Sequence, residues 1–264
     1  MPHSYLVNDH RQSMKTITSG LNSIFPTRDR YGLSEDAFVF CNFGQLFKID
    51  PEVFDTWMKI LKRVPNSVLW LLRFPPDGEV NLRAEARKRG VRDVQLHFSD
   101  VAANEEHILR GTLADLFLDT SICNAATTAC DILWMGTPMI TVKGERMISR
   151  VASSILTSAG LPEMICNSLS EYEELAVELA EDSEKLFSYR RRLEKTRENS
   201  AAFDTERWVR NWEKGLQAVV KKLGDNQLPG DIFVSDDEPV SVEVEESLLG
   251  LGLDNSMIAL QYAV

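Results

Sequence analysis

The chain has 264 residues, 44% of them hydrophobic, and a formal net charge of −11 at pH 7. This length can bury a sizeable core, enough for one large domain or two small ones. Asp225–Val264 holds nine carboxylates and no Lys or Arg, so the rest of the chain carries only −2. A nearly neutral body with an acidic tail argues against nonspecific nucleic-acid binding, which depends on neutralising phosphates, but still allows a small anionic ligand.

The cysteines and the N-terminal sequence indicate the compartment. The four cysteines show no CxxC pairing, so we expect reduced thiols and neither a disulfide scaffold nor a zinc site. The first residues, MPHSYLVNDHRQ, lack the apolar core of a signal peptide, and no apolar run approaches membrane-spanning length. We therefore expect a soluble protein of the cytoplasm and nucleus that binds no membrane.

Short apolar runs alternate with amphipathic stretches along the first 142 residues. In chain order, strands are expected at Ala37–Asn42, Ser67–Arg73, Val94–Phe98, Asp115–Asp119 and Met139–Val142. Helices are expected between them at Pro51–Arg63, Asn81–Gly90, Asn104–Arg110 and Thr127–Met135. Strand followed by helix, repeated with short links, predicts an α/β fold with a doubly wound, Rossmann-like parallel sheet.

After the fifth expected strand the pattern is helical only. Helices are expected at Ile148–Ala159, after a capping box of Ser170 and Glu173, at Glu184–Arg197 and at Asp204–Leu223. Beyond Gly224 the acidic, poorly patterned tail is predicted to be disordered.

Polar residues follow three of the expected strands, where a parallel sheet binds its ligands. They are Gln45 and Lys48 after the first strand, Asn104, His107 and Arg110 (with the backbone of Ala102) after the third, and Thr127, Thr128 and Asp131 after the fourth. A helix N-terminus favours an anion, and Thr127 and Thr128 add hydroxyl donors there. Asp131 lies one turn on, where it can accept from ribose hydroxyls, and Lys48 can supply a charge to a diphosphate.

A second interpretation of the same residues stays open. A threonine at a helix start is ordinarily a cap, and an aspartate in the first turn can be a partner of the helix dipole. A single lysine or histidine is most often a surface residue. The residue pattern therefore fits a nucleoside diphosphate site and an ordinary helix start about equally.

Three long stretches carry a specific resemblance. They are VFCNFGQLFKIDPEVFDTWMKILKRVPNSVLWLLRFP, FSDVAANEEHILRGTLADLFLDT and TTACDILWMGTPMITVKGERMISRVASS. They resemble the catalytic region of the protein O-linked N-acetylglucosamine transferases, nucleocytoplasmic enzymes that move N-acetylglucosamine from UDP-GlcNAc to protein Ser and Thr hydroxyls. The resemblance implies the C-terminal, donor-binding lobe of a GT-B glycosyltransferase with a helical C-terminal end. It implies domains at 1–30 (remnant of the N-terminal lobe and linker), 31–224 (UDP-sugar lobe) and 225–264 (tail).

The resemblance also implies roles for individual residues. Lys48 is similar to the family's catalytic lysine, which contacts the UDP diphosphate and stabilises the leaving group. The other UDP-binding positions implied are Gln45, Ala102, Ala103, Asn104, His107, Ile108, Leu109, Arg110, Ala126, Thr127, Thr128 and Asp131. The implied reaction is an inverting displacement with UDP-GlcNAc as donor and no metal or other cofactor.

The chain departs from the family pattern at several points. Ala125 and Ala126 stand where the family has Gly-His, and Asn104 stands where it has a lysine. The start, MPHSYLVNDH, resembles only the end of the N-terminal catalytic lobe, and no counterpart of the tetratricopeptide repeats is seen. A noncatalytic UDP-binding or regulatory fragment that needs a separate N-terminal lobe or repeat domain therefore remains an alternative to a protein transferase. A UDP-GlcNAc epimerase is a third, weaker one.

Overall fold

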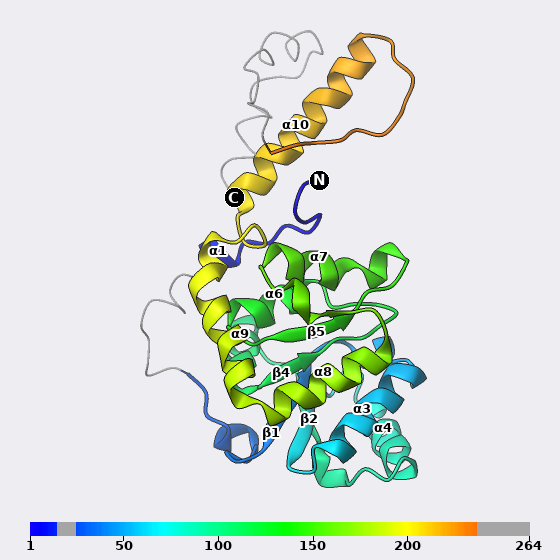
Figure 1. Ribbon diagram of the computed structural model, residues 1–264, viewed down its shortest axis with the longest axis vertical. Coiled ribbons are helices and arrows are strands. Elements are labelled where there is room, and N and C mark those ends of the chain that lie inside the picture. The colour runs from blue at the N-terminus through cyan, green and yellow to red at the C-terminus, as the bar shows by residue number, and fades with distance from the viewer. Residues whose placement is uncertain (15–24, 237–264) are drawn as a thin grey trace. The chain divides into compact units, whose positions relative to one another are not determined.

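The computed structural model describes residues 1–14 and 25–236. The chain divides into two units, His3–Thr205 and a second one that comprises Met1, Pro2 and the residues from Glu206 onward. The first unit has three layers, with a sheet between two layers of helices (Figure 1).

The sheet has six parallel strands in the order β3-β2-β1-β4-β5-β6. The strands are β1 (Phe38–Asn42), β2 (Ser67–Leu72), β3 (Leu96–Ser99), β4 (Leu116–Leu118), β5 (Met139–Val142) and β6 (Ile165–Cys166). This arrangement confirms the predicted doubly wound parallel sheet.

The helices cover both faces of the sheet. They are α1 (His10–Ser13), α3 (Pro51–Arg63), α4 (Asp77–Lys88), α5 (Asn104–Arg110), α6 (Thr127–Trp134), α7 (Val151–Ser158), α8 (Leu169–Glu181) and α9 (Ser183–Thr196), whereas α10 (Thr205–Gly224) belongs almost entirely to the second unit. With the right-handed crossovers that parallel strands nearly always have, this strand order puts α3 and α4 on one face and α5, α6 and α7 on the other. The chain then returns in α8 to the first face, where Trp57 of α3 donates to Tyr172 of α8.

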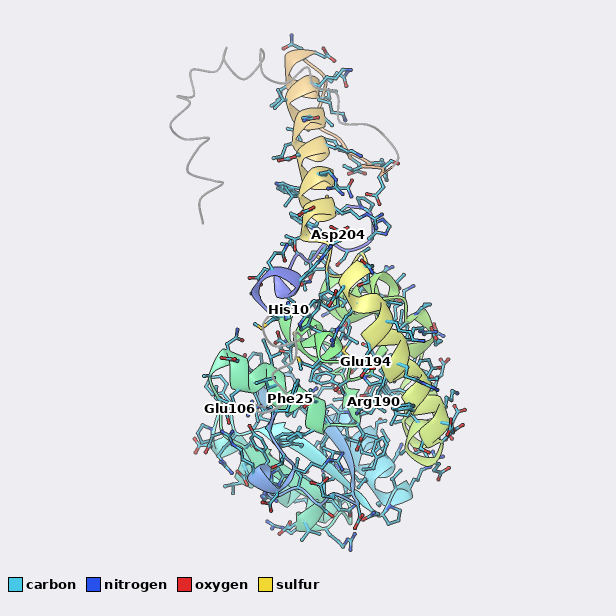
Figure 2. All side chains as sticks on the ribbon, turned by 90° about the vertical axis from the view of Figure 1, so that its left-hand side faces the viewer. His10, Phe25, Glu106, Arg190, Glu194 and Asp204 are labelled. Atoms are coloured by element: carbon cyan, nitrogen blue, oxygen red, sulfur yellow. The ribbon has the colours of Figure 1, made fainter. Side chains whose placement is uncertain are left out.

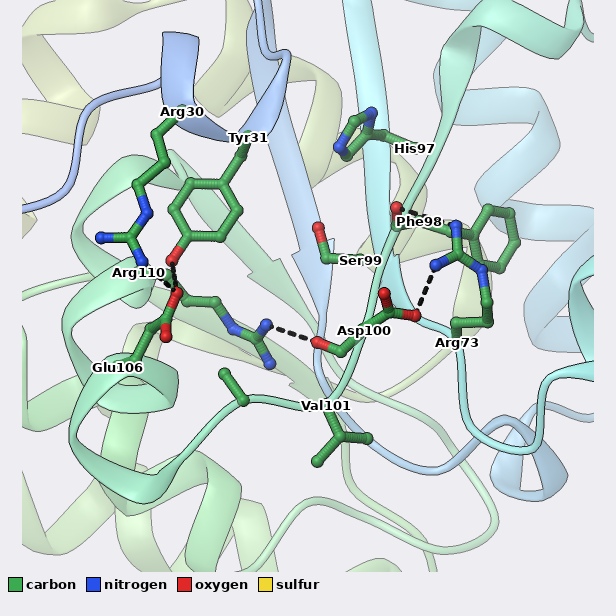
Figure 3. A pocket seen from close by; sticks show the side chains of 11 residues that line it. Arg30, Tyr31, Arg73, His97, Phe98, Ser99, Asp100, Val101, Glu106 and Arg110 are labelled. Carbon is green, nitrogen blue, oxygen red and sulfur yellow. Dashed lines mark hydrogen bonds and ion pairs between the residues drawn. The ribbon is translucent and has the colours of Figure 1, made fainter.

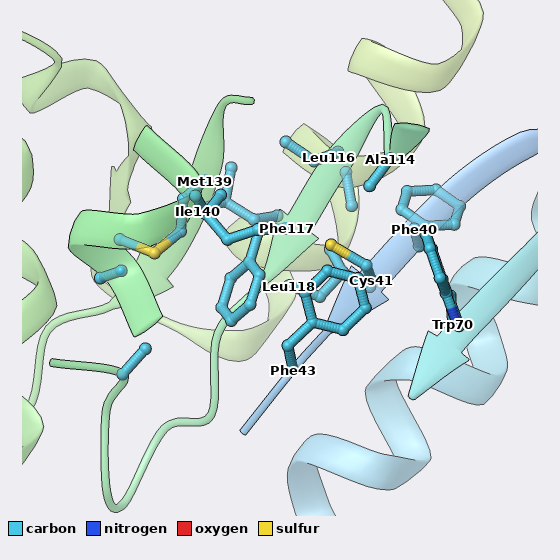
Figure 4. Close-up of a cluster of buried hydrophobic side chains, with 14 of the residues drawn as sticks. Phe40, Cys41, Phe43, Trp70, Ala114, Leu116, Phe117, Leu118, Met139 and Ile140 are labelled. Atoms are coloured by element: carbon cyan, nitrogen blue, oxygen red, sulfur yellow. The ribbon is translucent and has the colours of Figure 1, made fainter. Parts of the chain in front are cut away.

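The core lies around the central strands, whose side chains are almost completely buried (Figure 4). Phe40, Cys41, Leu116 and Phe117 are each 0% exposed. Near-continuous apolar strands are typical of a parallel sheet that is covered on both faces. The four cysteines are not paired with one another, and Cys41, Cys130 and Cys166 are buried.

Side chains cap some helices and leave others open. Asp50 caps α3, because its Oδ1 accepts from the backbone N–H groups of Glu52 and Val53, each at 3.0 Å. Ser168 caps α8 in the same way through the N–H of Glu171, at 3.1 Å. Within the described residues, no side-chain hydrogen bond caps the first turn of α5 or α6.

Several expected boundaries were wrong. The cap of α8 is Ser168 and not Ser170, and the chain forms a sixth strand, β6, where only helices were expected. The helix α4 begins at Asp77, four residues earlier than expected, and β3 begins at Leu96 because Asp93–Gln95 forms a 3₁₀ turn.

The second unit contains most of α10 and the segment that follows it. Within it, Asn211 donates to Asp236, and Lys214 donates to the carbonyl of Ser235 at 3.0 Å. The expected disordered tail is described only as far as Asp236, so residues 237–264 lie outside the described part of the chain. Among the helices that the structure describes, none has the length and hydropathy needed to cross a bilayer.

Candidate functional site

The strand order reverses between β1 and β4, and the ends of these two strands are held together. Asn42, the last residue of β1, donates from Nδ2 to the carbonyl of Leu118 at 2.7 Å and accepts from the N–H of Gly44 at 2.9 Å. In open parallel sheets, ligands bind at such a reversal point, outside the carboxyl ends of the strands.

Lys48 lies on the β1 side of this point, at the end of a 3₁₀ turn formed by Leu46–Lys48. Its Nζ donates to the carbonyl of Asn124 at 3.4 Å, so the ammonium group faces the loop that leads into α6. Gln45 precedes the turn and its side chain is exposed. The structure therefore brings Lys48 close to the start of the predicted phosphate-binding helix.

The loop between β4 and α6 is held by its own hydrogen bonds. The buried Asp119 carboxylate accepts from the N–H of Ala125 and from Thr141 Oγ1, both at 2.7 Å. Asn124 Nδ2 donates to the carbonyl of Thr120 at 2.7 Å. Burial raises the pKa of Asp119 to about 7, although these hydrogen bonds and the charge of Lys48 oppose the rise. The loop thus presents α6 in a fixed position.

The N-terminus of α6 is open. Its cap position is Ala126, which has no side-chain acceptor, and Thr127 is exposed while Thr128 is half-buried. The first-turn N–H groups of such a helix carry partial positive charge and no intrahelical partner, so an anion is favoured there. Among the described non-glycine residues only His3 and Asn226 have positive φ, so Ala125 stands where no glycine conformation is needed.

Asp131 lies one turn further along α6, between two histidines. Its Oδ1 is 2.7 Å from His10 Nε2, and its Oδ2 is 3.8 Å from His107 Nε2. The carboxylate is mostly buried, with the residue 8% exposed. The longer distance exceeds a hydrogen bond, so Oδ2 keeps acceptor capacity.

His107 and Arg110 connect Asp131 to the end of β3. Arg110 Nη2 is 2.8 Å from His107 Nδ1, and Arg110 Nη1 donates to the carbonyl of Asp100 at 2.9 Å. Burial, and then the Arg110 charge, lower the pKa of His107. Since a guanidinium can only donate, Nδ1 is the acceptor and the ring proton of neutral His107 is on Nε2, facing Asp131.

A cavity of about 420 Å³ lies on the other side of Arg110, beside the edge strand β3 (Figure 3). Arg110 and Ala102 line it, with Tyr31 and Glu106 joined across one wall by a 2.8 Å hydrogen bond. Arg110 is 1% exposed, and its Nε has no hydrogen-bond partner among the described residues. This Nε atom has almost no accessible surface, so Arg110 lines the cavity with other atoms and does not offer this N–H to a ligand.

The other predicted residues lie in different surroundings. Ala103 and Asn104 are exposed at the start of α5, next to Ala102. Ile108 and Leu109 pack into the core at 2% and 7% exposure, so only their backbone is near this edge of the sheet. The structure thus brings together Lys48 with the α6 loop, and separately Asp131 with His107 and Arg110.

Two residues at this edge were not predicted from the sequence. Asp119 follows an apolar strand directly, and a carboxylate in that position was a usable signal. No signal in the sequence pointed to His10, because it lies 121 residues from Asp131 in the chain. Among the described residues, no group of three or more His, Cys, Asp or Glu is arranged to hold a metal ion.

The family model and the similar proteins point to the same family. Residues 7–212 match the glycosyl transferase family 41. An Arabidopsis thaliana protein, the probable UDP-N-acetylglucosamine–peptide N-acetylglucosaminyltransferase SEC, is 49% identical over 81% of the chain and 22% of its own length. The Caenorhabditis elegans UDP-N-acetylglucosamine–peptide N-acetylglucosaminyltransferase is 44% identical over 82% of the chain and 19% of its own length. The chain thus spans about a fifth of the length of these relatives.

Solved structures agree with the fold. The Thermobaculum terrenum O-GlcNAc transferase, in its K341M mutant form, matches with a TM-score of 0.60 and 30% identity over 68% of this chain and 36% of that one. An Anabaena protein, HepE, solved with UDP and glucose, matches with a TM-score of 0.53 at 13% identity over 71% of this chain and 51% of that one, which supports the fold alone. The chain therefore belongs to glycosyl transferase family 41, and its sheet and helices form the C-terminal lobe of a GT-B glycosyltransferase.

Proposed function

We propose that this chain binds UDP-GlcNAc and serves as the donor-binding lobe of a protein O-GlcNAc transferase. The observation that carries the proposal is the position of Lys48, whose Nζ lies 3.4 Å from the Asn124 carbonyl, just before the open N-terminus of α6. An ammonium group and a helix N-terminus at one place favour a diphosphate.

The order of the polar groups along the edge of the sheet supports the binding of a complete nucleotide, with its base, ribose and diphosphate. The cavity beside Arg110, which Ala102 also lines, has room for the uracil base. Next along the edge comes Asp131, which suits the ribose hydroxyls, and then the first turn of α6 with Lys48. Base, ribose and diphosphate would therefore bind in that order along the edge of the sheet.

The proposed reaction is a direct displacement at the anomeric carbon by a protein Ser or Thr hydroxyl. The bond between the sugar and UDP breaks as the new bond forms, the hydroxyl gives up its proton to water or to the departing diphosphate, and negative charge develops on that diphosphate. Lys48, the Thr127 and Thr128 hydroxyls and the α6 N-terminus would stabilise that charge. The proposal includes no metal, and it places the protein in the cytoplasm and nucleus.

A noncatalytic UDP-binding module is the second candidate. It is favoured by Ala125 and Ala126, which stand where the resembled family has Gly-His, because an imidazole beside the diphosphate is then missing. In this case a separate N-terminal lobe would have to supply the acceptor side of the site.

Calorimetric titration of the full chain with UDP tests the binding proposal. We expect binding, and we expect Lys48→Ala to weaken it by ~10-fold or more, the scale of a lost charged contact. Lys59→Ala is the matched control, because Lys59 is an exposed lysine on α3. Undetectable UDP binding at millimolar concentration, or equal losses in both variants, would overturn the proposal.

A transfer assay with radiolabelled UDP-GlcNAc and a protein acceptor separates the two candidates. Label in the acceptor, lost in Lys48→Ala, would establish the transferase. Binding of UDP without transfer, restored by adding an N-terminal lobe from a relative, would establish a donor lobe that needs a partner. Binding that no added lobe converts into transfer would favour the noncatalytic module.

A further inference from the structure

His10 is a buried titratable side chain near the candidate site, and no role has yet been derived for it. It is 5% exposed and comes from α1, the short helix that contacts α6 (Figure 2). Its ring packs between Trp134 and Phe203, with centroid distances of 6.2 and 5.9 Å. A buried polar ring normally has hydrogen-bond partners for its nitrogens, and both nitrogens of His10 have one.

The orientation of the His10 ring is fixed by Asn8. Asn8 Nδ2 donates to the carbonyl of Ala202 at 2.7 Å, which turns the amide oxygen toward His10. That oxygen lies 3.1 Å from His10 Nδ1. The opposite nitrogen, Nε2, then lies 2.7 Å from Asp131 Oδ1, so a segment from the start of the chain holds a side chain of the predicted ribose site.

We propose that His10 is a positioning residue for the nucleotide ribose: it occupies one oxygen of the Asp131 carboxylate and so directs the other toward the ligand. The proposal rests on the proposed function, in which Asp131 accepts from the ribose hydroxyls. Asn8 Oδ1 and Asp131 Oδ1 can only accept, so the ring donates to both when each of its nitrogens carries a proton; Nε2 then donates to Asp131 Oδ1 and prevents rotation of the carboxylate. Oδ2, 3.8 Å from His107 Nε2, then remains the oxygen that receives a ribose hydroxyl.

A second consequence concerns selectivity. An Asp131 carboxylate that is held in place recognises hydroxyl groups, and a site built to bond a hydroxyl rejects the analogue that lacks it. His10 should therefore increase the preference for UDP over 2′,3′-dideoxy-UDP, which has the same base and diphosphate but lacks the ribose hydroxyls. A residue that only stabilises the fold would change the affinity for both nucleotides equally.

The test compares both nucleotides on the full chain by calorimetry. The wild-type chain should prefer UDP over the dideoxy nucleotide by ~10-fold, the scale of one charged hydrogen bond. His10→Phe keeps a ring but removes the donor, and should lose most of that preference. His10→Gln places an amide N–H near the position of Nε2 and should retain it. Phe203→Leu is the control, since it changes the packing of the same ring without removing a donor.

The outcomes separate this inference from the proposed function. If the wild-type chain binds UDP but His10→Phe keeps the full preference, or His10→Gln loses it as fully as His10→Phe does, the positioning role is wrong and the proposed function stands. If the wild-type chain does not bind UDP, both are overturned. Asp131→Ala combined with His10→Phe should be no worse than Asp131→Ala alone, because the two act through one carboxylate.

Discussion

The helices α3 and α6 begin at the same edge of the sheet, after the neighbouring strands β1 and β4, yet they begin differently. Asp50 occupies the free N–H groups of α3, while its Oδ2 accepts from Ser121 Oγ at 3.0 Å. In α6 the corresponding position is Ala126, which has no acceptor. A carboxylate there would repel a phosphate and compete for the same donors, so the comparison separates a helix start built for stability from one open to an anion.

The largest expected effect comes from giving α6 the cap of α3. Ala126→Asp should weaken UDP binding by ~100-fold, because a fixed carboxylate would lie within a few ångströms of the diphosphate. The same change should stabilise the free protein by about 1 kcal/mol through capping. Calorimetry and urea unfolding measure the two effects. Ala126→Ser is the neutral control, and equal losses of affinity in both variants would show that charge is not the cause.

The next effect concerns the pH dependence of stability at Asp119. Its pKa is raised by burial to about 7 from 3.8, so the folded state binds a proton that the unfolded state releases. The stability that this group contributes is therefore fully present below about pH 4 and is lost as the pH rises through 7. Relative to Asp119→Asn, the wild-type free energy of unfolding should fall by on the order of 2 kcal/mol between pH 5 and pH 8. A constant difference in urea titrations would contradict this.

The smallest effect should come from removing the cap of α3. Asp50→Ala should lower the free energy of unfolding by about 1 kcal/mol, the usual cost of an N-cap, and change the UDP affinity by less than ~3-fold. Ser168→Ala, which removes the cap of α8, is the matched control for stability. A loss of UDP affinity in Asp50→Ala as large as that in Ala126→Asp would remove the distinction between the two helix starts.

Elements with strong local signals could be predicted from the sequence. Pro51–Arg63 and Met139–Val142 were correct to the residue, because Asp50 and Pro51 mark one helix start and an apolar run marks the strand. The start of α8 could not be decided locally. Ser168 with Glu171 and Ser170 with Glu173 both fit a capping box, and only the first forms, in a helix whose Tyr172 donates to the buried Asp119 carbonyl.

The candidate site was predictable where it follows from the order of strands and was not where it depends on distant segments. The loop with Lys48 and the start of α6 meet because β1 and β4 are neighbours at the reversal of strand order. The contact between His10 and Asp131 depends on how the first residues of the chain pack on α6, and no spacing or periodicity reports that. Helix periodicity did not reveal that Ile108 and Leu109 are core residues either.

The most direct measurement is the affinity of the full chain for uridine and for UDP under the same conditions. If the α6 N-terminus and Lys48 hold the diphosphate, UDP should bind ~100-fold more tightly than uridine, and Lys48→Ala should reduce that ratio by ~10-fold. Equal affinities for uridine and UDP, or a ratio that Lys48→Ala leaves unchanged, would contradict a diphosphate site at this edge of the sheet.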